Sequence, residues 1–153
     1  MFEVREDDLT GKQVRALLEL HLADMHASSP PGSVFALDLS GLQVPEVTVW
    51  TAWRDGRVAA IGAMKIFGDG LAEVKSMRTH PHFLRMGAGA AILETIITAA
   101  TVRGIRRLSL ETGRGPAFEP ALALYRRRGF RNGMAFGGYE QSAFNQFLHL
   151  DLP

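Results

Sequence analysis

A short glycine turn near the middle of the chain is the feature best suited to binding chemistry. It consists of Arg85, Met86, Gly87, Ala88, Gly89 and Ala90. A strand-like segment at 71–77 precedes the turn, and an apolar-periodic run at 91–102 follows it. The first N–H groups of a helix lack partners within it, and glycine lets a ligand approach them closely because no Cβ intervenes. The helix dipole adds partial positive charge there, so the sequence predicts an anion site suited to a pyrophosphate.

The elements that would position this turn follow from the apolar pattern and from the glycine and proline breaks within it. Strands are predicted at 2–5, 47–53, 57–67, 71–77, 107–112, 130–136 and 146–150. Helices are predicted at 12–25, 87–103 and 120–128, with Thr10 as the first N-cap and a short helical turn around 35–39. Alternation in the 71–77 strand places Glu73, Lys75 and Met77 on one face. The expected fold class is α/β, with a mixed, mostly antiparallel sheet and helices on both faces.

Length and composition bound the class of protein. The chain has 153 residues, 46% hydrophobic and 22% charged, as expected of a single globular domain covering 1–153. A formal net charge of +1 argues against a general nucleic-acid-binding protein, which needs a basic face. The absence of cysteine excludes disulfides, thiolate metal sites and a cysteine nucleophile. No apolar run approaches the ~20 residues of a membrane span, and the acidic N-terminus is unlike a secretory signal, so we expect a cytoplasmic protein.

Three motifs, in this order, resemble the GCN5-related N-acetyltransferase (GNAT) superfamily, and the resemblance covers nearly the whole chain. The segment at 77–81, Met-Arg-Thr-His-Pro, is similar to a strand end that precedes the family's glycine turn. The turn itself is similar to the acetyl-CoA motif Arg/Gln-x-x-Gly-x-Gly/Ala, although Leu84 stands at the leading position and Arg85 follows it. Leu-Tyr-Arg-Arg-Arg-Gly-Phe at 124–130 resembles a frequent family ending. Within the family the chain looks most like the small bacterial acetyltransferases called YsnE-like.

The resemblance implies an enzyme with acetyl-CoA as its cosubstrate. The phosphates of CoA would lie on backbone N–H groups from about Met86 to Ala91, and the pantetheine arm in a fork between the fourth and fifth strands. Backbone at Met77 and Thr79 would bind that arm, and the N–H of Met77 would polarise the thioester carbonyl. The implied cofactor-binding residues are therefore Met77, Arg78, Thr79 and the six residues of the turn.

The same resemblance implies acetyl transfer to a primary amine of a small molecule or peptide, directly within a ternary complex. Tyr125 is the candidate acid, because a phenol can protonate the departing thiolate. Glu73 and Glu111, on the two strands beside the fork, are the candidate bases for the ammonium proton. Each also has an ordinary structural interpretation, as a packed tyrosine or an ion-paired carboxylate.

Several alternatives stay open in the sequence. A catalytically silent CoA-binding regulatory domain would keep the same fold and turn. The three arginines at 126–128 either solvate a helix end or contact the 3′-phosphate of CoA. Segments 28–33 and 137–141 are candidate covers of the acceptor site, and no metal is expected from the histidine spacing. The acidic N-terminus and Glu73 favour a cationic acceptor, and a homodimer through the terminal strands is compatible with the sequence.

Overall fold

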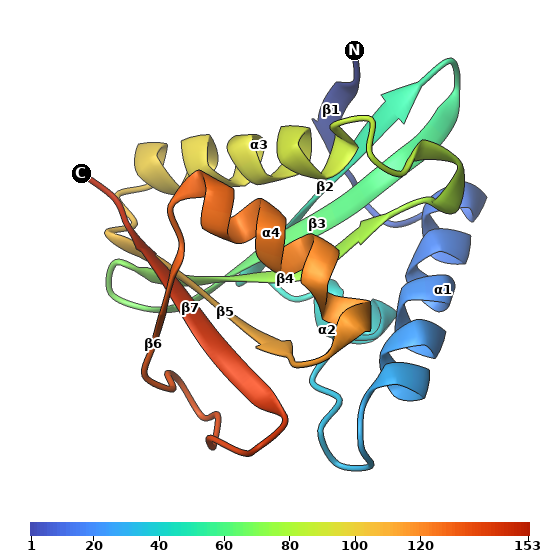
Figure 1. Ribbon diagram of the computed structural model, residues 1–153. Helices are drawn as coiled ribbons and strands as arrows, with labels where there is room; N and C mark the ends of the chain where they lie inside the picture. Colours follow the sequence, from blue (N-terminus) through green and yellow to red (C-terminus); the bar gives the residue numbers. More distant parts are fainter.

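One sheet of seven strands organises the computed structural model, which describes residues 1–153 (Figure 1). The strands lie in the order β1-β2-β3-β4-β5-β7-β6. Their bounds are β1 (Glu3–Glu6), β2 (Val47–Arg54), β3 (Arg57–Gly68), β4 (Leu71–Thr79), β5 (Arg107–Gly113), β6 (Arg131–Gly133) and β7 (Asn145–Asp151). The α-helices are α1 (Lys12–Ser28), α2 (Leu39–Leu42), α3 (Ala88–Val102) and α4 (Glu119–Arg128). Every neighbouring pair is antiparallel except β4 and β5, which confirms the predicted mixed, mostly antiparallel sheet.

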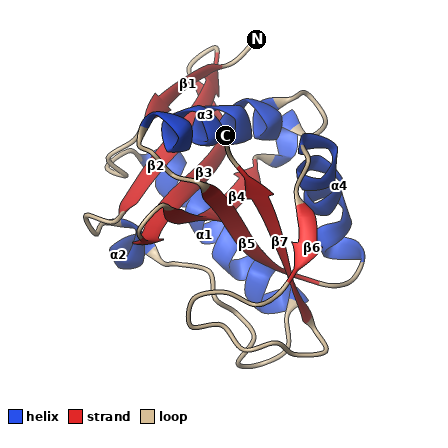
Figure 2. Cartoon of the chain, turned by 90° about the vertical axis from the view of Figure 1, so that its left-hand side faces the viewer, coloured by secondary structure: helices blue, strands red, loops and turns tan.

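Helices cover both faces of this sheet, as the element order predicted (Figure 2). On one face α1 buries an apolar stripe against β3 in the smaller of two cores, with Val14, Leu17 and Leu18. On the other face α3 buries a wider stripe, as its 3.6-residue period requires. That larger core contains Ile92, Leu93, Ile96, Ile97 and Ala100 of α3 with Leu122 and Tyr125 of α4. The two helices α3 and α4 are therefore held on one side of the sheet, away from α1.

The one parallel pair creates an opening in the sheet. Strand β4 pairs with β5 only from Leu71 to Glu73, opposite Arg107 to Ser109. Beyond that point β4 continues along β3 to Thr79, and β5 continues along β7 to Gly113. The two strands thus separate into a fork, and the backbone edge of β4 after Glu73 has no strand partner on that side. The fork lies where the family resemblance implied it.

A β-bulge in β4 changes which side chains share a face. Ile61 pairs with Arg78 and Ala63 with Lys75, so Ser76 and Met77 both lie opposite Gly62. Ser76 adopts a left-handed φ of +57°. Met77 packs with the α3 core, whereas Lys75 pairs beside Ala63 of the α1 core. The prediction that Met77 shares a face with Glu73 and Lys75 is therefore wrong, because strict alternation does not survive the extra residue.

Two predicted helical features differ from the structure near the N-terminus. Thr10 is not the cap of α1: Gly11 holds that position, and the Thr10 hydroxyl donates to Asp8 Oδ1 at 2.7 Å instead. The short helix predicted around 35–39 is displaced to α2, where the Asp38 carboxylate accepts from the Gly41 N–H at 2.9 Å. No helix in the structure is long and apolar enough to cross a membrane.

Candidate active site

A cavity of about 680 Å³ fills the fork between β4 and β5. Its walls come from the start of α3, the inner face of α4, the end of α1 and segment 33–36. The predicted site residues that line it are Glu73, Met77, Arg78, Thr79, Arg85, Gly87, Ala88, Gly89, Ala90, Glu111 and Tyr125. Met86 does not line it: its sulfur lies 3.8 Å from Arg54 Nη1. The structure therefore brings together all but one of the residues that the sequence singled out.

The start of α3 presents a row of unpartnered backbone donors to this cavity. Gly87 caps the helix in a left-handed conformation, with φ of +89°. None of the N–H groups from Met86 to Ala90 donates a hydrogen bond within the chain. Ala91 donates to the Gly87 carbonyl at 3.0 Å, so the row ends one residue earlier than predicted. A row of free N–H groups at the positive end of a 15-residue helix fits a pyrophosphate.

A second glycine lies where the turn approaches the sheet. A Cβ on Gly89 would lie 3.4 Å from both Leu124 Cδ2 of α4 and Thr79 Oγ1 of β4. A methyl group would therefore just reach van der Waals contact with both elements. The start of α3 thus lies close to the end of β4, with room for only a small residue between them.

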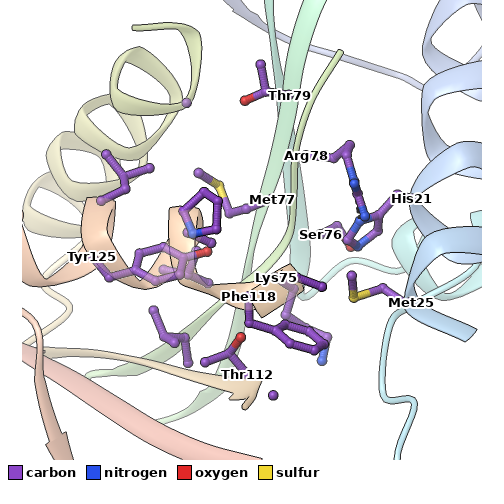
Figure 3. A pocket seen from close by; sticks show the side chains of 18 of the residues that line it. His21, Met25, Lys75, Ser76, Met77, Arg78, Thr79, Thr112, Phe118 and Tyr125 are labelled. Carbon is purple, nitrogen blue, oxygen red and sulfur yellow. Dashed lines mark hydrogen bonds between the residues drawn. The ribbon is translucent and has the colours of Figure 1, made fainter. Parts of the chain in front are cut away.

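Tyr125 reaches the same cavity from α4 (Figure 3). The residue is 94% buried because its position in α4 faces the sheet, and its ring lies against Phe130 at a centroid distance of 5.7 Å. Its hydroxyl makes no hydrogen bond within the protein, and burial raises the pKa of the phenol above its usual value. The group is therefore a neutral O–H donor that lines the cavity without a partner.

Glu73 forms a buried ion pair at the base of the fork. Lys75 Nζ lies 3.2 Å from Glu73 Oε2, and both side chains are 8% exposed. The Tyr139 hydroxyl donates to the same oxygen at 2.6 Å, and Lys75 Nζ donates to that hydroxyl at 2.7 Å and to the Phe35 carbonyl at 3.3 Å. We call Glu73, Lys75 and Tyr139 the buried triad. It ties the segments around Phe35 and Tyr139 to β4.

The predicted alternation of β4 put Glu73 and Lys75 on one face, which the structure confirms, but their partners Tyr139 and Phe35 were not predicted. The signal was weak: a lysine two residues from a glutamate in an otherwise apolar strand. Tyr139 belongs to segment 137–141, which the sequence offered as a cover of the site. Its ring packs edge-on against Phe35 at 5.2 Å, behind the cavity wall rather than in it.

Glu111 lies on β5, across the fork from the buried triad. Burial, with a smaller contribution from the nearby Glu73 charge, raises the pKa of its carboxyl to about 7, while the Lys75 charge and a hydrogen bond from Asn145 oppose the rise. Near neutral pH the group therefore exists in both protonation states. Its carboxylate lines the cavity and has no ion-pair partner, unlike Glu73.

On the α1 side of β4 the cavity wall is polar. Arg78 Nε donates to His21 Nδ1 at 3.1 Å, and Arg78 Nη1 donates to Asp24 Oδ2 at 3.0 Å. Figure 3 shows Ser76, Arg78 and His21 on this side, with Met77 and Tyr125 on the other. The Arg78 side chain thus points away from the free N–H row of α3.

The three arginines that end α4 have different surroundings. Arg126 donates to Asn132 Oδ1 at 3.0 Å, and Arg128 pairs with Glu94 of α3. Arg127 is exposed, lines the cavity and makes no hydrogen bond or ion pair within the chain. No group of three or more His, Asp or Glu side chains is placed to hold a metal ion.

Comparison with known proteins assigns the family. Residues 14–130 match the model of the Acetyltransferase (GNAT) family. The chain is 41% identical over 152 residues to the uncharacterized N-acetyltransferase YedL of Escherichia coli (strain K12), covering 99% of this chain and 96% of that protein. It is 43% identical over 145 residues to the uncharacterized N-acetyltransferase YsnE of Bacillus subtilis (strain 168), covering 95% and 96%.

Solved structures share the fold. A provisionally named acyl-CoA N-acyltransferase of Klebsiella pneumoniae aligns with a TM-score of 0.82 at 25% identity, covering 99% of this chain and 98% of that one. The PaiA N-acetyltransferase of Thermoplasma acidophilum, solved in complex with coenzyme A, aligns with a TM-score of 0.76 at 12% identity and 99% coverage of both chains.

The chain therefore belongs to the GNAT family of acetyltransferases. It is an enzyme of the N-acetyltransferase class, with acetyl-CoA as its cosubstrate. The match to YsnE confirms the resemblance to the YsnE-like subgroup.

Proposed function

We propose that this enzyme transfers the acetyl group of acetyl-CoA to a primary amine of a small molecule or peptide, directly within a ternary complex. The observation that supports this most strongly is that three kinds of group open into one cavity. They are the free N–H row of α3, the phenol of Tyr125 and the carboxyl of Glu111. Direct transfer needs these parts together: an anion cradle, an acid and a base.

Binding of the cosubstrate uses backbone more than side chains. The N–H groups of Gly87 to Ala90, which line the cavity, bind the phosphates, and the unpaired edge of β4 at Met77 and Thr79 holds the pantetheine arm. Acetyl-CoA supplies the acetyl group as a thioester, whose C–S bond breaks as the C–N bond of the amide forms. The N–H of Met77 polarises the thioester carbonyl, since a fixed dipole stabilises charge that develops on that oxygen.

Glu111 is the base in this proposal, in preference to Glu73. An amine arrives as ammonium and must give up a proton before its nitrogen attacks. Glu73 Oε2 already accepts hydrogen bonds from Lys75 and Tyr139 in a buried ion pair, so the Lys75 charge favours the ionised carboxylate over a protonated one. Glu111 has no ion-pair partner, and its pKa of about 7 matches the task of accepting a proton near neutral pH.

Tyr125 is the acid. The thiolate that leaves when the C–S bond breaks takes the proton of the Tyr125 hydroxyl. This donor is held in place by the contact of its ring with Phe130, and no protein acceptor competes for its proton. The phenolate regains a proton from solvent once products depart.

The test is turnover by the full-length enzyme, with acetyl-CoA and a broad panel of amines, beside a Tyr125→Phe variant. We expect acetylated amine from the parent, a loss of about 10²-fold or more in kcat for the variant, and equal CoA affinity for both proteins by calorimetry. CoA binding without acetylation of any amine would instead favour a catalytically silent CoA-binding regulatory domain.

A further inference from the structure

The cavity contains a polar cluster that the proposed chemistry does not use. It lies on the side of β4 that faces α1, and it consists of Ser76, His21 and Arg78 (Figure 3). We call these three residues the donor cluster. Ser76 and Arg78 come from the bulged end of β4, and His21 comes from the buried face of α1.

Ser76 Oγ is a buried polar atom without a partner. It is the one buried side-chain nitrogen or oxygen in the structure that makes no hydrogen bond, and Ser76 as a whole is 7% exposed. The residue nevertheless lines the cavity, because its left-handed φ turns it towards α1 at the bulge. A buried hydroxyl without a partner is costly for a protein. A ligand in the cavity that accepts its hydrogen bond would remove that cost.

His21 offers a second donor. Its Nδ1 accepts a hydrogen bond from Arg78 Nε at 3.1 Å, so the ring proton must reside on Nε2. Burial, together with the Arg78 charge, lowers the pKa of His21 to about 4, which keeps the ring neutral with a single N–H. That Nε2–H has no acceptor within the protein, and the residue lines the cavity while only 5% exposed.

Arg78 supplies a third donor and the positive charge. Its Nε and Nη1 are used by His21 and Asp24, whereas Nη2 donates to no protein atom. Its side chain is 20% exposed and lines the cavity, but Asp24 does not line it. The cluster therefore presents two N–H donors, a hydroxyl that can donate as well as accept, and the positive charge of Arg78. This combination suits an oxyanion better than an ammonium group.

We propose that the donor cluster binds the carboxylate of the acceptor, so that the acceptor is a free amino acid or a close analogue carrying both a primary amine and a carboxylate. The identity of its amine half rests on the proposed function. A carboxylate has two oxygens that can accept from all three donors, and the bond from Arg78 is charge-assisted. The amine then lies towards Glu111, on the far side of the same cavity.

This proposal replaces the cationic acceptor that the sequence favoured. The charge of Glu73 is matched by Lys75 within the buried triad, so it does not attract a cation. The acidic residues at 6–8 line a separate hollow formed with α2 and β2, and none of them lines the cavity in the fork. Glu73 thus lines the cavity with its charge already paired, and the acidic N-terminal residues lie outside it.

The test is calorimetric titration of the CoA-saturated, full-length enzyme with pairs of ligands that differ only in the carboxylate. Each pair is an amino acid and its decarboxylated amine, such as phenylalanine and phenethylamine. We expect at least one amino acid to bind about tenfold tighter than its amine or better, as a charge-assisted bond implies. Ser76→Ala and Arg78→Gln should each remove this preference, because each should lower the affinity for the amino acid and leave the affinity for the amine unchanged.

Ser40→Ala is the matched control, since Ser40 is an exposed serine of α2 that does not line the cavity and should leave both affinities unchanged. Ser76→Ala removes an unpartnered hydroxyl, so it should fold as stably as the parent. Equal binding of both members of every pair, or an equal loss for both members in the variants, would overturn the proposal. Turnover of the same pairs separates the two proposals. Acetylation of simple amines without a carboxylate preference overturns only the donor-cluster proposal, whereas a carboxylate preference without acetylated product contradicts only the proposed function.

Discussion

The ionisation of Glu111 determines whether the cavity holds a base at neutral pH. Because burial raises the pKa of this carboxyl to about 7, the charged form that accepts a proton predominates only above that pH. We therefore expect kcat/KM to rise with pH through about 7. Glu111→Gln should remove this rise and lower kcat by about 10²-fold or more. A pH–rate profile of both proteins at saturating acetyl-CoA measures this.

The pH dependence of the unfolding free energy tests the raised pKa of Glu111 independently of activity. A raised pKa means that the folded state binds the proton more tightly than the unfolded chain does, so stability falls as pH rises from about 4.5 to about 7. Glu111→Gln removes that loss and should be at least as stable as the parent above pH 7.

The control for the pH–rate profile is Glu140→Gln. It changes an exposed carboxyl outside the cavity and should keep the parent pH–rate profile. An unchanged pH–rate profile in Glu111→Gln would show that Glu111 is not the base.

The sequence predicted which residues line the cavity better than it predicted where their side chains point. Glu73, Glu111 and Tyr125 were placed on the correct elements and line one cavity. The orientation of Met77 was wrong because the β4 bulge sits at Ser76, and no glycine marks that position. The hydrogen bond between Arg78 and His21 could not be predicted from local sequence, since it joins residues 57 positions apart.

At the scale of elements, the end of α4 offers the cavity one free arginine. Arg127 lines it without a partner, whereas Arg126 is bound to Asn132. If Arg127 contacts the 3′-phosphate of CoA, the Arg127→Ala variant should bind CoA about tenfold more weakly, as the loss of a charge-assisted contact implies. The same variant should bind 3′-dephospho-CoA with unchanged affinity. Arg126→Ala is the control, and calorimetry with the two ligands is the measurement. Equal weakening of both ligands would assign Arg127 to helix solvation alone.

The buried triad makes a different prediction, about stability. Lys75→Met leaves the Glu73 carboxylate buried without its cation, which should cost about 3–5 kcal/mol of unfolding free energy. The double variant Lys75→Met, Glu73→Leu removes both charges and should recover most of that loss, because the two sites are coupled. Denaturant unfolding of the parent, both single variants and the double variant measures the coupling. Losses that simply add would show that the pair is not coupled.

Element boundaries were predictable where they depend on local sequence and not where they depend on distant contacts. The 87–103 prediction for α3 nearly matches Ala88–Val102, since glycine marks both ends. Strand β6 is only Arg131–Gly133, although a strand was predicted at 130–136. After Gly133 the chain leaves the sheet, and Tyr139 is drawn to Lys75 and Glu73 on β4. That contact is tertiary, so strand propensity could not show it.

At the scale of the whole molecule, the proposed cosubstrate site is assembled from segments far apart in the chain. The free N–H row belongs to α3, the unpaired edge to β4 and the phenol to α4, and each is held by a shared core against the sheet. The order of elements predicted the mixed sheet with helices on both faces, whereas the fork between β4 and β5 was implied by the family resemblance and not by the order alone. A ligand that contacts α3, β4 and α4 together can bind only the folded protein, so its binding should raise the free energy of unfolding.

Binding of CoA should therefore raise the free energy of unfolding of the enzyme. CoA at about 100 times its Kd should add about 2.7 kcal/mol, which for a chain of this size is a rise of about 5–10 °C in Tm. Gly87 allows a matched test, since a Cβ there meets nothing within 4 Å but the left-handed φ of +89° strains most residues. Asn tolerates that conformation and Asp has the same shape with a negative charge. Gly87→Asn should therefore keep most of the CoA-dependent shift, and Gly87→Asp should lose it. If both variants kept the full shift, the phosphates of CoA would have to bind elsewhere than the start of α3.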